Sequence, residues 1–268
     1  MAIASVDDIA AGLSSSAKSI PIAKTLTAPK AAGAFQSSWL ANGNPGPGVA
    51  PSLYSDGSGY TCDKDTAGAI QITNGAVQLW LAKLALNCTQ PGVIILADRL
   101  WSCSGIGFAS GTYTITTPGN LPARITDNGV GCELWIEQFV AAGSASGTLT
   151  ANYLNANDGS AKSGVISAVV SAPVIGQMQP VPRAAGDTGI RQLTSIAHSN
   201  TWTSGSIGAT ILKRIAEVPI IAANGGMNLD WAQLALPKIP NDACLFAFFL
   251  ANGTTAPVIL GSITTIDK

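Results

Sequence analysis

The residues that could carry out chemistry are few in this chain and lie far apart. A Ser-His-Asp or Cys-His site would need the single histidine, His198, which lies in the Ser/Thr-rich segment SIAHSNTWTSG. The segment GSASG has Ala145 where the nucleophile elbow of a hydrolase has serine. We therefore interpret His198 as an exposed loop residue, and we predict that the chain is not an enzyme.

The acidic residues also lack the spacing that acid-base catalysis needs. Glu133 and Glu137 would share one face of a strand, about 13 Å apart at roughly 3.3 Å per residue. Glycoside hydrolysis uses carboxyl groups about 5–9.5 Å apart. We interpret both as solvent-facing or interface charges. Asp187 begins an Asp-Thr-Gly turn, and an aspartic protease needs two such motifs where this chain has one.

No metal or cofactor site is predicted. Asp56, Asp63 and Asp65 offer oxygen atoms at loop spacing, but Ca²⁺ takes about six to eight ligands and the EF-hand order is missing. The five cysteines form no C-x-x-C pair, so zinc spacing is absent. We favour buried free thiols. A disulfide formed after assembly stays open as an alternative, with Cys88–Cys103 as the first candidate.

Composition restricts the partners. Apolar residues make up 47% of the chain and charged residues 11%, against roughly 25% charged in a typical soluble domain. The net charge of −1 and the lack of a Lys/Arg run predict no nucleic-acid partner. No window reaches the roughly 20 apolar residues of a membrane helix, and the start MAIASVDDIAAGL lacks a basic n-region, so we expect a non-secreted, non-membrane protein. Such a charge-poor surface indicates contact with other protein.

The first 55 residues are predicted to form an extended N-terminal arm with a short helix. Residues 3–17 have helical apolar spacing, and Ser5 is placed to cap the helix. The following stretch is rich in proline and glycine and poor in apolar residues. We expect Phe35, Trp39 and Leu40 to anchor this arm in a groove of another chain, which makes them candidate interface residues.

Beyond residue 60, short apolar runs alternate with turn residues, which is typical of an all-β sandwich or jelly-roll-like fold. Strands are predicted at 92–101 and 111–117. Residues 148–170 are predicted to form a hairpin around the turn Asn157-Asp158-Gly159. One or two helical turns are expected before Pro237, capped by Asn228 or Asp230.

Sequence blocks recur in the same order about 112–116 positions apart, which predicts an internal duplication. The first β-module is expected at residues 56–175 and the second at 176–268, joined by the segment SAPVIGQMQPVP. The alternative is that β-proteins of such restricted composition resemble themselves by chance. The matched pairs are Leu81 with Leu193, Gly92 with Gly208, Leu121 with Leu236 and Cys132 with Cys244.

One strand is written twice, as CELWIEQFVAAG (132–143) and CLFAFFLANG (244–253). In the first copy Glu133 and Glu137 are expected to face outward, while Leu134 and Ile136 face the core. In the second copy Leu245 and Phe249 replace the glutamates, so both faces need cover. Exposing roughly 100–200 Å² of apolar area would cost a few kcal/mol. We therefore predict that Leu245 and Phe249 lie in an interface with the sister module, the arm or a neighbouring subunit.

The segments GVIILADRLW, GCELWIEQF, AAGDTGIRQL and LDWAQLALPKIPNDACL, within residues 20–268, resemble virion structural proteins of tailed bacteriophages. This resemblance brings no catalytic residue. It implies a capsid decoration (cement) protein that is made in the bacterial cytoplasm, forms a homo-oligomer, most simply a homotrimer, and binds a major capsid protein in the virion. Two alternatives stay open: a tail, neck, baseplate or major shell protein of a phage, and a carbohydrate-binding or adhesin β-sandwich.

Overall fold

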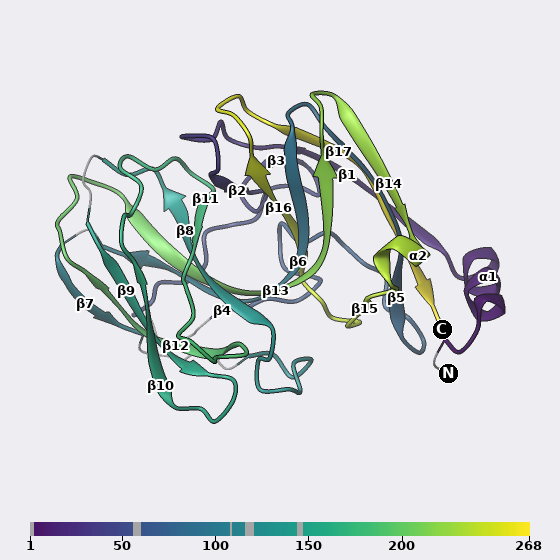
Figure 1. Ribbon diagram of the computed structural model, residues 1–268, viewed down its shortest axis with the longest axis horizontal. Helices are drawn as coiled ribbons and strands as arrows, with labels where there is room; N and C mark the ends of the chain where they lie inside the picture. Colours follow the sequence, from purple (N-terminus) through teal and green to yellow (C-terminus); the bar gives the residue numbers. More distant parts are fainter. Residues whose placement is uncertain (1–2, 56–59, 108, 116–120, 144–146) are drawn as a thin grey trace. The chain divides into compact units, whose positions relative to one another are not determined.

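The computed structural model describes residues 3–55, 60–107, 109–115, 121–143 and 147–268, which form many strands and two short helices (Figure 1). The predicted all-β class and the predicted N-terminal helix are confirmed. In chain order the elements are α1 (Val6–Ser15), β1 (Lys18–Thr25), β2 (Phe35–Ser37), β3 (Asn42–Asn44), β4 (Tyr60–Thr61), β5 (Leu79–Cys88), β6 (Gly92–Ile106), β7 (Gly111–Thr114), β8 (Cys132–Val140), β9 (Leu149–Asn155), β10 (Ala161–Ile166), β11 (Gln177–Pro180), β12 (Ile190–His198), β13 (Ser206–Ile220), β14 (Gly225–Asp230), α2 (Trp231–Leu234), β15 (Lys238–Ile239), β16 (Leu245–Ala251) and β17 (Val258–Asp267).

The chain forms two compact units, and neither is a continuous stretch of sequence. Unit 1 consists of Met1–Gly48, Asp63–Asp98 and Ile215–Lys268, and unit 2 consists of Val49–Cys62 and Arg99–Arg214. The units therefore do not follow the expected boundaries at 1–55, 56–175 and 176–268. The reason lies in β6 and β13, because each of these 15-residue strands passes from one unit into the other.

Unit 1 is a sandwich of two antiparallel sheets. One sheet has the order β14-β5-β17-β1-β3, and β1 pairs with β17 over the whole length of β1 (Figure 1). In the other sheet β16 lies between β2 and the first half of β6. The core between the sheets contains Leu81, Ile94, Leu245, Phe249 and Ile263, each fully buried.

Unit 2 repeats this arrangement with other strands. One sheet has the order β10-β9-β12-β7, and in the other β8 lies between β11 and the first half of β13. Its core contains Leu134, Tyr153, Leu193 and Ile211. Strands β6 and β13 also pair with each other. When the short strands β3, β4 and β15 are left aside, each unit has four strands in each of two facing sheets, and their order makes each unit a jelly roll.

The strand pairing of the two units shares one bulge at an equivalent position. Leu81 pairs with Thr265 in unit 1, and Leu193 pairs with Tyr153 in unit 2. In both ladders the next residue of the first strand, Ala82 or Thr194, is skipped in a bulge before pairing resumes. A bulge at matching positions makes β12 the counterpart of β5, and β9 the counterpart of β17.

Each unit therefore takes strands from both halves of the chain. Unit 1 combines β1, β2, β5 and the start of β6 with the end of β13, β14, β16 and β17. Unit 2 combines β10, β11, β12 and the start of β13 with the end of β6, β7, β8 and β9. The repeated elements thus run from β1 to β9 and from β10 to β17, and each repeat contributes half of each jelly roll.

The two similar strands, β8 and β16, correspond with a one-residue shift from the predicted match. The backbone N–H of Val181 donates to Leu134 O, and the N–H of Ser38 donates to Ala247 O in the same position of unit 1. Leu134 is therefore the counterpart of Ala247, not of Phe246. Because a one-residue shift exchanges the two faces of a strand, it is Leu245 and Phe249 that face the sandwich core, and the predicted assignment of faces in this strand is wrong.

The predicted extended arm is part of unit 1. Strand β1 lies inside a sheet, Trp39 is 1% exposed, and Lys24 is buried with its Nζ donating to Ala41 O (3.0 Å) and Gly46 O (3.1 Å). The sparse apolar residues of this stretch are sufficient because β16 and β17 supply the rest of the core. The arm prediction is wrong for this reason.

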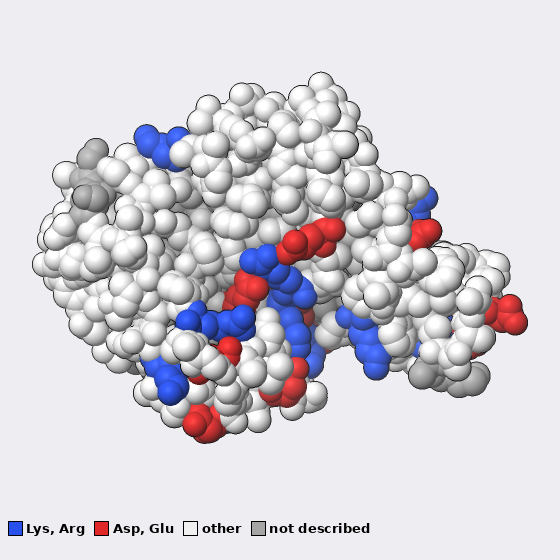
Figure 2. All heavy atoms as spheres, viewed as in Figure 1, with Lys and Arg blue, Asp and Glu red and all other residues white. Residues whose placement is uncertain are grey.

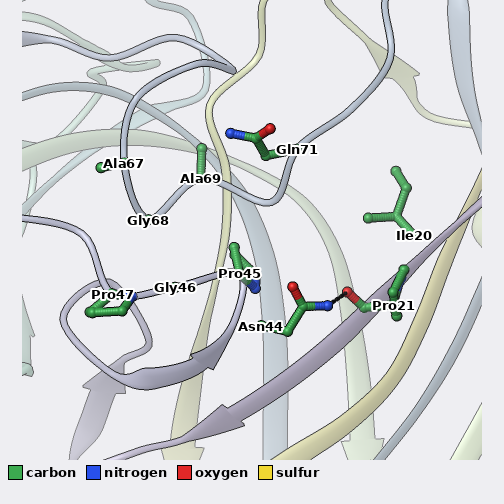
Figure 3. A pocket seen from close by; sticks show the side chains of 10 residues that line it. All are labelled: Ile20, Pro21, Asn44, Pro45, Gly46, Pro47, Ala67, Gly68, Ala69 and Gln71. Atoms are coloured by element: carbon green, nitrogen blue, oxygen red, sulfur yellow. Dashed lines mark hydrogen bonds between the residues drawn. The ribbon is translucent and has the colours of Figure 1, made fainter.

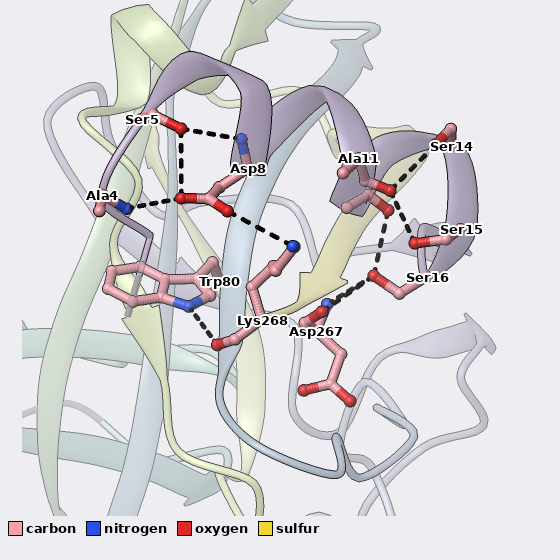
Figure 4. Close-up of polar contacts among 11 residues, drawn as sticks. Ala4, Ser5, Asp8, Ala11, Ser14, Ser15, Ser16, Trp80, Asp267 and Lys268 are labelled. Atoms are coloured by element: carbon pink, nitrogen blue, oxygen red, sulfur yellow. Dashed lines mark hydrogen bonds and ion pairs between the residues drawn. The ribbon is translucent and has the colours of Figure 1, made fainter. Parts of the chain in front are cut away.

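The N-terminal helix α1 is capped as predicted, because Asp8 N–H donates to Ser5 Oγ (3.2 Å). It lies at the chain's C-terminal end, where Lys268 Nζ approaches Asp8 Oδ1 at 3.5 Å and Ser16 Oγ donates to Asp267 O (Figure 4). Ile9 packs with Ile266 beneath it. The helix α2 begins at Trp231 and is capped by Asp230, one of the two predicted residues.

Candidate interaction surface

His198 is not the exposed loop residue that the sequence suggests. It is the last residue of β12 and only 6% exposed, between the rings of Tyr113 (5.8 Å) and Trp202 (6.0 Å), and Tyr113 in turn contacts Tyr54 (5.5 Å). Burial lowers the pKa of His198. A neutral imidazole packed edge-on between aromatic rings is a core residue, and its counterpart in unit 1 is Leu86.

The two glutamates of β8 have different environments. Glu133 is half-buried, with an oxygen 3.1 Å from Arg214 Nε. Glu137 is 1% exposed, lies 2.7 Å from Arg99 Nη1 and accepts a hydrogen bond from Thr210 Oγ1 (2.6 Å). The Arg99 guanidinium also lies 5.7 Å from the ring of Phe139. The expected outward position of Glu137 is therefore wrong, because Arg99 neutralises it inside unit 2.

Asp187 belongs to a structural hydrogen-bond network. Its carboxylate accepts from Tyr153 Oη (2.6 Å) and Asn155 Nδ2 (3.2 Å), and Tyr153 Oη in turn accepts from the backbone N–H of Ala184. Burial raises the pKa of Tyr153. The network joins β9 to the connection before β12, in agreement with the turn role expected for Asp187.

The other predicted chemical residues are not brought together. Asp63 accepts hydrogen bonds from Asp65 N–H and Thr66 in its own turn, and Asp56 lies outside the described residues. In the described part of the chain, no three His, Cys, Asp or Glu side chains are grouped to hold a metal ion. All five cysteines are buried, and Cys88 and Cys103 lie in the cores of units 1 and 2, respectively.

The predicted interface residues lie within unit 1 itself. Leu245 and Phe249 have no exposed surface, Trp39 packs edge-on against Phe246 (6.3 Å), and Phe35 packs against Phe248 (6.0 Å). Leu40 is half-buried. The unit's own N-terminal segment, which is one of the three predicted covers, lies on the second apolar face of β16. Trp39, Leu245 and Phe249 are therefore core residues of unit 1, while Phe35 and Leu40 are half-buried.

A cavity of about 520 Å³ lies beside β1 and β3 in unit 1 (Figure 3). Its described lining is small and uncharged, and its polar side chains are Asn44 and Gln71. Asn44 Nδ2 donates to Pro21 O at 3.0 Å. The nearby Lys24, whose pKa burial lowers to about 8, is bound to the carbonyl oxygens of the same loop. This lining offers hydrogen bonds but no acid or base for catalysis.

Four connections meet at one end of unit 1, which we call loop end 1: residues 26–34, 89–91, 221–224 and 252–257. Three of them are joined by backbone hydrogen bonds, from Gly33 N–H to Ala251 O (2.7 Å) and from Asn252 N–H to Pro91 O (3.2 Å). A cavity of about 430 Å³ lies among them, lined in part by Val93, Ile220, Ile221 and Leu250. Ile221 is 88% exposed.

The equivalent loop end 2 of unit 2 consists of residues 107–110, 141–148, 167–176 and 199–205, of which 108 and 144–146 lie outside the described residues. Its connections are also joined to each other. Ala142 N–H donates to Pro173 O, Gly143 N–H to Ser204 O, and Ser110 N–H to Thr201 Oγ1.

Charge is almost absent from both loop ends. Among all their residues the sequence contains one charged side chain, Lys30 in loop end 1. The connections at the opposite ends of the strands, whose described residues include 63–78, 121–131, 181–189 and 231–244, carry charges of both signs. On the face drawn in Figure 2, charged side chains occupy a few places and most of the surface is uncharged. These surfaces could have been predicted from the sequence, because the connections between the predicted strands that form them contain almost no charged residues.

No protein-family model and no curated protein matches the chain. A solved structure titled "Structure of infectious bursal disease virus Gt strain" is similar to it at 9% identity, over 93% of this chain and 80% of that chain, with a TM-score of 0.21. In the described residues, no helix has the length and apolar character needed to cross a membrane.

Proposed function

We propose that this chain is a non-enzymatic structural subunit of a phage particle, which binds and stabilises the capsid shell as a decoration protein. The observation that supports the proposal best is that one chain builds two equivalent jelly rolls with a charge-poor surface. Jelly rolls are used for viral capsid domains, lectins and cupins. The step from fold to function is an analogy. Lectins and cupins, the other two classes with this fold, therefore have to be tested against the residues present.

The described residues suit the other two classes less well. A cupin enzyme needs a metal-binding side-chain cluster, and the described residues contain none. A lectin of the aromatic-platform type needs exposed rings, but Trp39, Trp101, Trp135 and Trp202 are each at most 4% exposed. These four tryptophans stabilise the units, and the other two, Trp80 and Trp231, are half-buried, so none of the six rings is fully exposed for stacking on sugars.

A capsid role agrees with the duplication. Three copies of a chain with two equivalent units present six similar units around a threefold axis. Such a trimer matches the sixfold positions of a capsid lattice, which also makes a major shell protein the second candidate. A partner in the major capsid protein, and a virion location, are parts of this proposal.

The test uses particles from the phage or prophage that carries this coding sequence. Antibody-gold labelling in negative stain should mark the head, and mild denaturant should release the protein while leaving closed shells. Labelling of the tail or baseplate would replace the decoration role by a tail role. Loss of the shell together with the protein would identify a major shell protein, and unlabelled particles would refute a virion role.

A further inference from the structure

The two loop ends combine features that separate them from the rest of the surface. Each is built by four connections that are distant in sequence, and each is nearly free of charge. The absence of charge is specific to these ends, because the connections at the opposite ends of the same strands are charged. An overall shortage of charged residues would affect both ends alike.

Both loop ends also expose apolar side chains. Ile221 projects from loop end 1 beside the cavity that Val93 and Leu250 help to line. In unit 2, Val140 and Ile175 are 49% and 39% exposed, and the hydrogen bond from Gly176 N–H to Gln138 O (2.8 Å) places their backbones side by side. The same end of each jelly roll thus exposes apolar side chains, and Lys30 is the one charged residue in the sequence of the two ends.

The loops are held in position before any partner arrives. Hydrogen bonds between neighbouring connections join all four at loop end 2. At loop end 1, Val258 N–H also donates to Thr89 Oγ1 (2.9 Å). Because these hydrogen bonds fix the described parts of the loops in advance, association there loses less conformational entropy than ordering free loops would.

We infer that the loop ends are the surfaces through which copies of this chain associate. A charged partner surface would lose its hydration against these ends and gain no ion pair in return. A second loop end is equally poor in charge, and contact between like surfaces is the geometry of closed symmetric assemblies. The inference concerns self-association and does not depend on the proposed capsid role.

The experiment compares Ile221→Lys and Val140→Lys, alone and together, with the controls Val77→Lys and Val130→Lys. The control residues are similarly exposed (57% and 42%) but lie in the connections at the opposite ends. Sedimentation velocity over about 1–100 µM should show a wild-type oligomer. The double loop-end variant should weaken self-association by about a hundredfold, because an unpaired lysine would be buried in the contact. The controls should leave it unchanged.

Circular dichroism and the thermal midpoint establish that each variant is folded. A wild-type protein that stays monomeric over this range overturns the inference. So does an oligomer that withstands both loop-end substitutions, or one that the controls weaken equally. A monomer whose loop-end variants lose binding to phage particles would assign these ends to the shell, refuting self-association while supporting the capsid role.

Discussion

At the scale of single residues, several side chains that suggested chemistry serve the interior of unit 2. Arg99 and Glu137 are both essentially unexposed, and each would be costly to bury without the other. His198 fills a position that is leucine in the equivalent strand. These buried residues therefore contribute to the stability of unit 2. Their contributions to the free energy of unfolding can be measured separately.

Removing one partner of the buried ion pair should destabilise the protein strongly. We expect Glu137→Ala to lower the free energy of unfolding by about 3–5 kcal/mol, because the Arg99 charge stays buried. The half-buried Glu133 provides the control, and Glu133→Ala should cost about 1 kcal/mol or less. Urea denaturation measures both. A double variant Arg99→Met/Glu137→Leu should lose less than Glu137→Ala, and an equal or larger loss would contradict this explanation.

Stability should fall in mild acid because of His198. Its folded pKa lies below the unfolded value of about 6.5, so below that pH the unfolded chain binds more protons than the folded chain. The histidine therefore favours unfolding as the pH falls through 6.5 and towards the folded pKa. Urea denaturation at pH 7.5 and 5.5 should show a smaller loss for His198→Leu than for the wild type. Equal losses in the two proteins would show that other groups cause the acid sensitivity.

At the scale of elements, the N-terminal strands belong to the fold and not to a detachable arm. Strand β1 pairs with β17 along its length, and Trp39 covers Phe246. Helix α1, in contrast, contacts the sheet through Ile9 and a few polar bonds near Lys268. These two parts of the N-terminal segment should respond differently to truncation.

Deletion of residues 1–16 should leave a folded protein with a slightly lower thermal midpoint, because it removes only α1. Deletion of residues 1–48 should abolish cooperative unfolding of unit 1. It removes β1 from one sheet and β2 from the other, so both sheets of the sandwich are incomplete. Circular dichroism melts and limited proteolysis measure both effects. A well-folded 49–268 fragment would show that these strands are dispensable, as an external arm would be.

At the scale of the whole molecule, each half of the chain completes both jelly rolls. The turn at 157–159 connects β9 and β10, the last and first elements of the two repeats. A break in this turn removes no strand from either unit. Each fragment alone, however, has half of the strands of each unit and leaves two incomplete cores.

Fragments 1–157 and 158–268 should therefore assemble when they are expressed together. We expect affinity purification of one to recover the other at a one-to-one ratio, with the far-ultraviolet spectrum of the intact chain. Each fragment expressed alone should be insoluble or should associate with itself, because its apolar faces lack their partners. A folded, monomeric fragment obtained alone would contradict the exchange of strands between the units.

The sequence by itself determined the features that depend on a few neighbouring residues. Alternating apolar runs predicted an all-β protein, and Asn157-Asp158-Gly159 predicted the β9–β10 turn. Ser5 was predicted to cap the first helix, and Asn228 or Asp230 the second, of which Asp230 is the cap. Turn and cap preferences act over three or four residues, so they can be read without the fold. The uncharged connections were equally visible, although nothing local shows that four of them meet.

Only the tertiary structure decided which strands share a unit. Pairings such as β1 with β17 join residues far apart in the chain, and local sequence carries no measure of their relative free energies. The one-residue shift between β8 and β16 also follows from pairing between distant strands. Because of this shift, the residues of β16 that were predicted to face outward face the core. Burial of Glu137, His198 and Trp39 followed from these pairings, because each is covered by segments that no sequence pattern connects to it.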